Sequence, residues 1–369
     1  MCFFPNLTRA EGAASRGLFV SLVQDPPTLS SHSHILKLVD FAKTAHINIL
    51  FVQIYRANQA WFPSKTTDDK PYQIYLKTFS EDPLGLLIQE AHRSGIKVHA
   101  WLNLLSLSNN KEASFIKKYG LSILTRNSKD KKTIDDYKID DQYFLEPSDP
   151  HVRRDLSRIV GEILQTYPSL DGIQFDYIRY PDVHPSYGYT QYNMEQFKKK
   201  TAVKTISEKD PLWRQWKRDQ VTQLLKELVH KAQQVHPGIQ VSTTGCVSYI
   251  RAYEEAFQDW PSWLKMGLVD FVTIMSYPTD TLEFQKNIFD AQKRTTNFKK
   301  INIAVGAYKP EHSPAVFKEN FQLCQESGGG ACVIFHYGSV LQKPAIREYL
   351  ISGSRPQAEP SQIKKTAAQ

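Results

Sequence analysis

The sequence predicts an α/β fold, a single (β/α)8 TIM barrel that spans residues 16–350. Eight short apolar runs are rich in β-branched or aromatic residues, and segments with helical spacing lie between them. This alternation is typical of parallel strands joined by crossover helices, and eight such strands close a barrel. A doubly wound sheet is the alternative, but no glycine-rich phosphate turn follows the first run.

The elements follow one another in a regular order. The expected strands are residues 17–23, 47–54, 96–102, 170–176, 239–244, 269–276, 301–306 and 331–336. The expected helices are residues 33–45, 83–94, 150–167, 212–236, 282–296 and 315–327. Three connections from strand to helix are long, namely residues 55–82, 103–149 and 177–211. They leave the carboxyl ends of strands, so we expect long loops and the functional site on that face.

Composition limits the class of protein. The chain has 369 residues with 41% hydrophobic and 12% aromatic content, enough for a sizeable core. Its formal charge of +8 is spread along the chain, so nucleic-acid binding is not predicted. No apolar run approaches the roughly 18 residues that span a bilayer, so no integral membrane contact is predicted. Four widely spaced cysteines predict neither a zinc site nor a disulfide framework.

The two ends are expected to lie outside the barrel. Residues 1–15 form an N-terminal extension without the basic start and apolar stretch of a signal peptide. A start codon assigned too late is the alternative explanation of that absence. Residues 351–369 form a polar C-terminal tail without a periodic pattern.

The strongest local signal ends the fourth expected strand. Alternation places Gln174, Asp176 and Ile178 on one side and the apolar Ile173 and Phe175 on the other. The apolar side suits the helices, so Asp176 points into the barrel mouth, where an ionisable group needs a function or a partner. We predict that Asp176 is the catalytic acid and that Arg179 positions it; a structural Asp176–Arg179 salt bridge is the alternative.

The long loops carry many aromatic side chains. Their rings suit the apolar faces of sugars, although packing of the loops against the barrel explains any one of them equally well. They are Trp61, Phe62, Tyr72, Tyr75, Tyr143, Phe144, Tyr180, Tyr187, Tyr189 and Tyr192.

Other side chains are predicted to line the mouth. Trp101 is expected as a stacking platform, and His99 and Asn103, on the same face of the third strand, as hydrogen-bonding partners. A buried, satisfied histidine is the alternative for His99. On the second strand Gln53 and Tyr55 are expected to share a face. The remaining predicted substrate-binding residues are Arg56, Trp61, Gln174, Arg179, Tyr180, Tyr277, Tyr308 and His336; of these, Arg56 suits a carboxylate or phosphate substituent.

Other chemistries have weaker support. The sequence has no Gly-x-Ser-x-Gly motif, no Walker loop and no metal-binding histidine spacing, so no cofactor and no metal are predicted. Cys246 with His99 or His336 as base is the nucleophilic alternative. A small buried thiol is the commoner role of such a cysteine.

The motif at residues 171–177, Asp-Gly-Ile-Gln-Phe-Asp-Tyr, resembles that of glycosyl-hydrolase-like family ten, a group of (β/α)8 proteins. The resemblance continues, in order, through residues 16–20, 51–56, 61–64, 82–84, 91–103, 145–153, 216–221, 263–271 and 335–337. The family usually has two adjacent aspartates after the fourth strand, where this chain has Asp176 and Tyr177. A more distant similarity to chitinase-like barrels places Ile178 at their catalytic glutamate.

The resemblance implies a glycoside hydrolase that acts on a bacterial-type polysaccharide, with a cell-wall glycan containing N-acetylhexosamine as one candidate. It also favours export to the cell envelope. Glycoside hydrolysis normally needs two carboxyl groups, and Glu311 and Asp280 are the candidates for the second, with Asp182 close to Asp176. A substrate-assisted route needs only one. A glycan-binding barrel without catalysis is the alternative function.

Overall fold

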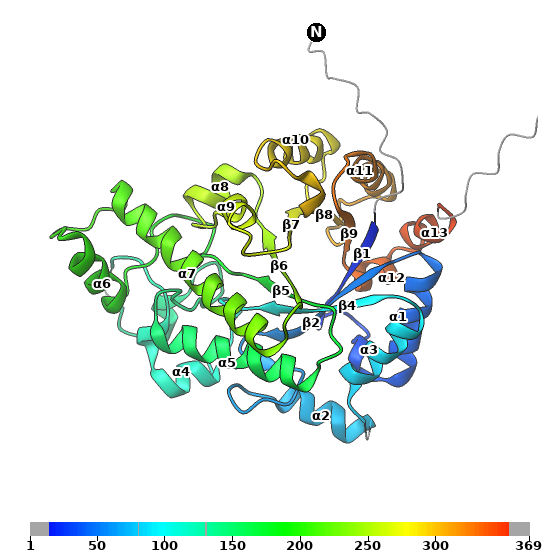
Figure 1. Ribbon diagram of the computed structural model, residues 1–369, viewed down its shortest axis with the longest axis horizontal. Helices are drawn as coiled ribbons and strands as arrows, with labels where there is room; N and C mark the ends of the chain where they lie inside the picture. The colour runs from blue at the N-terminus through cyan, green and yellow to red at the C-terminus, as the bar shows by residue number, and fades with distance from the viewer. Residues whose placement is uncertain (1–14, 80, 130, 354–369) are drawn as a thin grey trace, which may run out of the picture.

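The computed structural model describes residues 15–79, 81–129 and 131–353. Eight parallel strands pair side by side, and the last pairs with the first, so the sheet closes into a barrel surrounded by helices (Figure 1). The barrel strands are β1 (Ser15–Val20), β2 (Ile49–Arg56), β4 (Lys97–Asn103), β5 (Gly172–Asp176), β6 (Gln240–Gly245), β7 (Phe271–Ser276), β8 (Ile301–Gly306) and β9 (Ala331–Phe335). The short β3 (Gln59–Ala60) pairs antiparallel with the end of β2.

The predicted fold is confirmed. All eight predicted strands are present within three residues of their expected bounds. The predicted N-terminal extension and C-terminal tail lie almost wholly outside the described residues. Within the described part of the chain, no helix combines the length and the apolar character that crossing a membrane requires.

The main helices begin at sequence signals that the chain repeats. Asp82, Asp149 and Asp210 each accept a hydrogen bond from a backbone N–H of the first turn, and each is followed by proline. Proline suits the first helical position because its missing N–H would have no helical partner there. The long outer helices are α1 (His32–Thr44), α3 (Pro83–Arg93), α5 (Pro150–Thr166), α7 (Pro211–Val235), α10 (Thr281–Gln292) and α11 (Pro314–Glu326).

The two faces of the strands build two separate packing layers. Leu50, Val52 and Ile54 of β2 point outward and join the large core under the helices. The inward layer contains Phe19 and Trp101, which pack at 4.9 Å between ring centroids. Large buried rings therefore fill the barrel, and any site must lie above them at the mouth.

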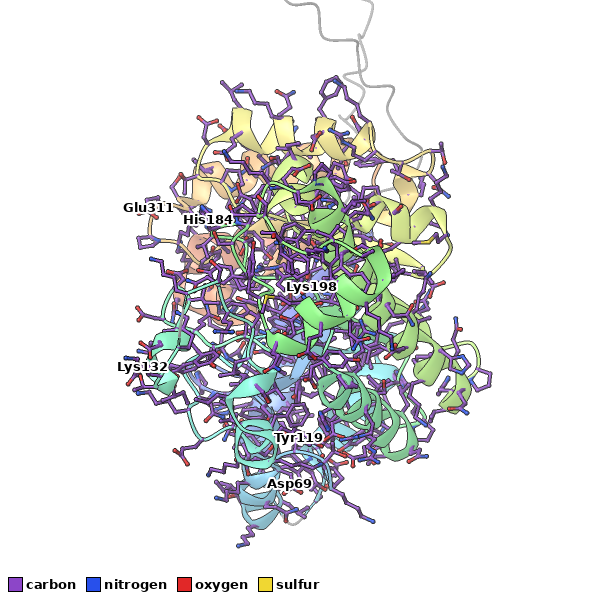
Figure 2. The ribbon with its side chains drawn as sticks, turned by 90° about the vertical axis from the view of Figure 1, so that its left-hand side faces the viewer. Asp69, Tyr119, Lys132, His184, Lys198 and Glu311 are labelled. Atoms are coloured by element: carbon purple, nitrogen blue, oxygen red, sulfur yellow. A yellow bond between two sulfur atoms is a disulfide. The ribbon has the colours of Figure 1, made fainter. Side chains whose placement is uncertain are left out.

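The long loops carry helices that the sequence analysis did not predict. These are α2 (Lys70–Phe79), α4 (Ser114–Tyr119) and α6 (Gln191–Thr201), with α8 (Tyr249–Glu254), α9 (Trp260–Lys265), α12 (Tyr337–Gln342) and α13 (Pro344–Ser352) after later strands. Lys132, His184 and Glu311 come from three different strand-to-helix loops and lie along the same side of the molecule (Figure 2). The loops therefore gather on one face.

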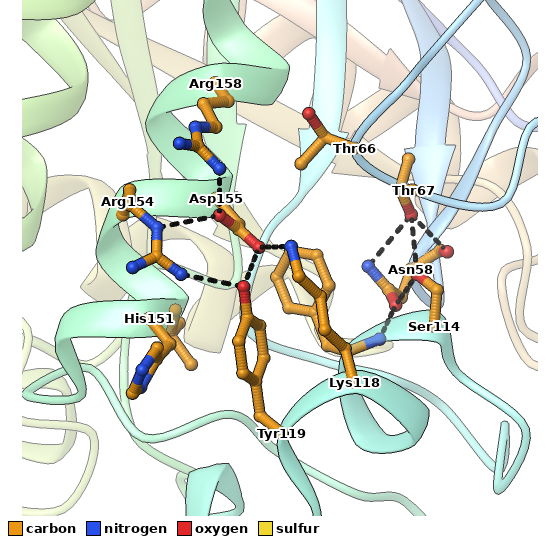
Figure 3. A network of polar contacts seen from close by, with 12 residues as sticks. Asn58, Thr66, Thr67, Ser114, Lys118, Tyr119, His151, Arg154, Asp155 and Arg158 are labelled. Atoms are coloured by element: carbon orange, nitrogen blue, oxygen red, sulfur yellow. Dashed lines mark hydrogen bonds and ion pairs between the residues drawn. The ribbon is translucent and has the colours of Figure 1, made fainter.

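One buried carboxylate fixes α4 to α5 (Figure 3). Asp155 accepts hydrogen bonds from the Tyr119 hydroxyl at 2.5 Å and the Lys118 ammonium at 2.9 Å. Arg154 and Arg158 also pair with it, each at 3.2 Å. Burial alone raises the pKa of this carboxyl, but these partners lower it overall, so the ion pairs hold the loop helix in place.

The cysteine prediction was wrong in one respect. Cys324 and Cys332 form a disulfide, although their spacing matches no framework. Helix α11 packs back along the strand that follows it, which brings the two Cα atoms to 5.9 Å. Only the tertiary packing of α11 against β9 places the two thiols within reach.

This disulfide predicts a redox-dependent stability. Closing its short loop restricts the unfolded chain, so the C324S/C332S double variant should lose about 2–3 kcal/mol of unfolding free energy. Denaturant unfolding with and without dithiothreitol measures this. Reductant should destabilise the wild type to the level of the double variant and leave the double variant unchanged. An insensitive wild type would contradict the prediction.

Candidate active site

Asp176 lies at the end of β5, opposite Asn103 of β4 in the strand register. Its side chain is 4% exposed and points into the barrel. The Trp101 indole N–H donates to Oδ2 at 3.0 Å, and the Thr244 hydroxyl donates to Oδ1 at 2.5 Å. The backbone N–H of Tyr177 donates to Oδ1 at 2.7 Å. Three neutral donors therefore fix the orientation of the carboxyl group.

Arg179 makes no ion pair with Asp176, so the structure shows neither the predicted positioning contact nor the alternative salt bridge. Its guanidinium donates to Asp182 at 2.6 Å and lies 4.7 Å from the centroid of the Tyr177 ring. Arg251 also binds Asp182, at 2.6 Å. Two arginines thus occupy Asp182, and Asp176 has no ion pair within the described part of the chain.

Aromatic rings from several strands surround the carboxylate. Phe335 of β9 lies 4.9 Å from Tyr277 and 5.4 Å from Tyr308 between ring centroids, and 6.1 Å from Trp101. Burial, together with the nearby charge of Asp176, raises the pKa of Tyr277 well above its ordinary value. Tyr277 therefore keeps its proton, and Tyr308 is 42% exposed at the outer edge of this wall.

Three predicted binding residues bring polar atoms to the top of the barrel. The carbonyl oxygen of Gln53 accepts from the Ser21 hydroxyl at 3.3 Å, while its buried Nε2 has no partner among the described residues. The buried Oδ1 of Asn103 also has none among them. The guanidinium of Arg56, half-buried at the end of β2, makes no hydrogen bond or ion pair with the residues that the structure describes. The two amide atoms are enclosed, so the Arg56 guanidinium is the group of these three that is open to a ligand.

Several predicted residues take up positions deeper in the barrel or in its core. Gln174 accepts from the Ser242 and Thr273 hydroxyls below the mouth. A register shift after Gln53 turns Tyr55 into the outer core, where its hydroxyl accepts from Asn58, so the expected shared face is absent.

Other predicted residues are held at the edge of the site. Tyr180 is buried and donates to Glu146 at 2.5 Å, and Trp61 packs half-buried on the main core. The ring of His336 contacts the Ser339 hydroxyl at 3.3 Å.

Neither candidate for the second acid lies at the mouth floor. Asp280 is exposed and caps α10 by accepting from the Glu283 N–H at 2.8 Å. Glu311 is exposed in the β8–α11 loop, at the edge of the molecule in Figure 2. The structure therefore does not bring either carboxyl together with Asp176.

Two alternative functional groups are buried in neutral form. Burial lowers the pKa of His99 to about 4, and neither ring nitrogen has a protein partner. Its ring packs between Phe51 and Phe271, with centroids at 5.3 and 5.9 Å. Burial also raises the pKa of Cys246 to about 11, so its thiol stays protonated near neutral pH. A thiolate nucleophile at Cys246 is therefore disfavoured.

The sequence analysis missed two residues of this region. Thr244 could have been found, because Ser242 and Thr244 alternate as polar residues on one face of β6. Glu146 lies in no sequence pattern that would have identified it. It is fully buried between the two longest loops, burial raises its pKa, and the Tyr180 and Ser148 hydroxyls donate to it.

The fold defines the class as a (β/α)8 barrel, and solved glycoside hydrolase barrels share it. The glycoside hydrolase domain of PgaB (BpsB) from Bordetella bronchiseptica superposes with a TM-score of 0.71, covering 92% of this chain and 98% of that one at 13% identity. The β-galactosidase Gan42B from G. stearothermophilus gives 0.61, covering 95% and 60% at 13% identity.

The family model for Glycosyl hydrolase-like 10 matches residues 17–318, and the chain belongs to this family. Glycosyl hydrolase DigH of Escherichia coli K12 is 25% identical over 309 residues, which cover 74% of this chain and 67% of DigH. Glycosyl hydrolase YngK of Bacillus subtilis is 24% identical over 264 residues, which cover 66% of this chain and 48% of YngK. The predicted family is thus confirmed, and family and fold together support a glycoside hydrolase.

The Thr244 hydroxyl should contribute more to stability than the hydroxyl of its neighbour Thr243. Thr244→Val removes a donor from a buried carboxylate and should cost about 1.5–3 kcal/mol of unfolding free energy. Thr243→Val is the matched control, because the Thr243 hydroxyl is buried without a protein partner and its loss should not destabilise. Urea unfolding of both variants gives the comparison, and equal losses would contradict this account of Asp176.

His99 should make stability depend on pH. The unfolded chain takes up a proton as the pH falls through 6.5, whereas folded His99 resists protonation until about pH 4. Stability is therefore lost as the pH falls across this window, and His99→Leu should remove about 3 kcal/mol of that loss. Unfolding free energies at pH 7 and pH 4 measure it. Substitution of His230, exposed on α7, is the control and should leave the difference unchanged.

Proposed function

We propose that this protein hydrolyses glycosidic bonds in a polysaccharide and that Asp176 is its central catalytic group. The observation that carries the proposal is the Asp176 carboxylate, fixed by three neutral donors beneath a wall of aromatic rings. Family membership and the glycoside hydrolase barrels of similar fold support the same activity.

The three donors orient the Asp176 carboxyl, which suits its predicted role as a general acid at the glycosidic oxygen. Two arginines occupy Asp182 and the other candidate acids are exposed, so none of the candidate carboxyls among the described residues stands beside Asp176. This supports a substrate-assisted route, in which an N-acetyl group of the sugar supplies the nucleophile and Asp176, as the one protein acid, protonates the leaving glycosidic oxygen.

The proposed substrate is therefore a polysaccharide with N-acetylhexosamine, and a bacterial cell-wall glycan is the first candidate. The partly exposed rings of Phe335, Tyr277 and Tyr308 would provide surfaces for the sugar. Asn103, 7% exposed and opposite Asp176 in the strand register, would bind a hydroxyl or acetamido group, and Arg56 would bind an acidic substituent. Export to the cell envelope is proposed with this substrate, and the disulfide supports it because disulfides persist in oxidising compartments.

A glycan-binding barrel without catalysis is the second candidate. Two points favour it: the resemblance places Tyr177 and Ile178 where similar barrels carry carboxyl groups, and neither Asp280 nor Glu311 lies beside Asp176. Such a protein would hold the same glycan with the same aromatic wall and release it unchanged.

Turnover of soluble glycans, including peptidoglycan strands, tests the proposal when products are identified by mass spectrometry. Asp176→Asn is nearly isosteric and should lower turnover by about 10²- to 10⁴-fold, since an amide cannot protonate the leaving oxygen. Asp280→Asn and Glu311→Gln are the controls and should remain active if Asp176 acts without them. Cleavage that persists in Asp176→Asn would refute the assignment. Glycan binding without cleavage by the wild type would establish the second candidate.

A further inference from the structure

A second concave surface lies beside the mouth, between the loop that follows β4 and the starts of α5 and α6. It is a groove of about 510 Å³. Its lining residues are Leu121, Ser122, Leu124, Arg126, Lys131, Tyr137, Asp149, Pro150, His151, Thr190, Gln191, Tyr192 and Glu195. We refer to it as the α5–α6 groove.

The lining combines rings with balanced polar groups. Tyr192 is 38% exposed, and Tyr137 and His151 add two further rings. Arg126 and Lys131 supply two cations, and Asp149 and Glu195 supply two carboxyl groups. A groove for an anionic polymer needs an excess of cations, whereas hydroxyl groups use donors and acceptors alike. The balance fits a neutral saccharide, whose ring faces pack on tyrosine.

Most of these charged groups are already held in place. Arg126 donates to the backbone oxygens of Tyr189 at 3.1 Å and Lys129 at 3.3 Å. Asp149 caps α5, and Glu195 accepts from Gln191 at 2.8 Å. Lys131 makes no ion pair among the residues that the structure describes. The groove is therefore preorganised, and Lys131 and Tyr192 are its most available contacts.

A short series of contacts connects the groove to Asp176. Arg126 lines the groove, and the preceding residue, Thr125, donates its backbone N–H to Phe144 at 2.8 Å. The Phe144 ring lies 6.3 Å from that of Tyr177, which directly follows Asp176. The same two loops thus form one wall of the mouth and one wall of the groove.

We propose that the α5–α6 groove binds a neutral stretch of the polysaccharide chain outside the catalytic mouth. This proposal rests on the proposed function only for the identity of the polysaccharide, since binding in the groove needs no catalysis. Binding at both places on one strand raises the local concentration of the polymer at Asp176. Longer oligosaccharides should therefore bind more tightly than short ones.

Isothermal titration of the full chain with N-acetylglucosamine hexamer tests the groove. Tyr192→Ser and Lys131→Met should each weaken hexamer binding about five- to tenfold. The matched controls are Phe289→Ser, which removes an exposed ring on α10, and Lys132→Met, which removes the neighbouring lysine outside the groove. Both controls should bind as the wild type does. If Tyr192→Ser and Lys131→Met bind the hexamer as tightly as the two controls do, the proposal is overturned.

Two further probes separate the alternatives. Polyglutamate should not compete with the hexamer, and equal competition would show a charged surface instead of a sugar site. If the protein hydrolyses glycans but Tyr192→Ser leaves hexamer binding unchanged, the groove proposal alone is refuted. Hexamer binding that depends on Tyr192, without hydrolysis of any glycan, would instead refute the proposed hydrolase activity and leave the groove established.

Discussion

The site depends on a buried carboxyl group that neutral groups hold in place. Asp176 is almost fully enclosed, and its hydrogen-bond donors are an indole, a hydroxyl and a backbone amide. Buried carboxyl oxygens need hydrogen-bond partners of this kind, because burial without them costs free energy. The donors come from β4, from β6 and from the residue after β5, so the site exists only while three adjacent parts of the barrel keep their register.

The mouth is built from loops, but polar networks beneath them make those loops rigid. Asp155 of α5 joins that helix to α4 through two partners, Lys118 and Tyr119, while two arginines of α5 also pair with it. Glu146 joins the two longest loops through the Tyr180 hydroxyl. The protein is destabilised when a buried group of this kind loses one partner, so each network fixes one arrangement of its loops. A catalytic group that must be held to a fraction of an ångström needs such support below the residues that touch the substrate.

Periodicity was sufficient to predict the barrel and the inward direction of Asp176, because both follow from alternation along single strands. Contacts that depend on loop conformation or on an irregular strand could not be predicted in this way. Arg179 is three residues from Asp176 but pairs with Asp182, and a register shift separates Tyr55 from Gln53. Cys324 and Cys332 meet only because α11 folds back on β9. The local sequence pattern is sufficient to predict the fold, whereas these contacts depend on tertiary geometry.

The rings that fill the barrel also limit how a polymer can approach. Phe19, Phe51 and Trp101 are almost fully buried and block the barrel axis below Asp176. A strand cannot thread through the molecule, so it must enter and leave on the same face. A chain that lies across this face does not have to present a free end. The architecture is therefore compatible with cuts in the interior of a strand, and each cut would release two fragments from the same side of the protein.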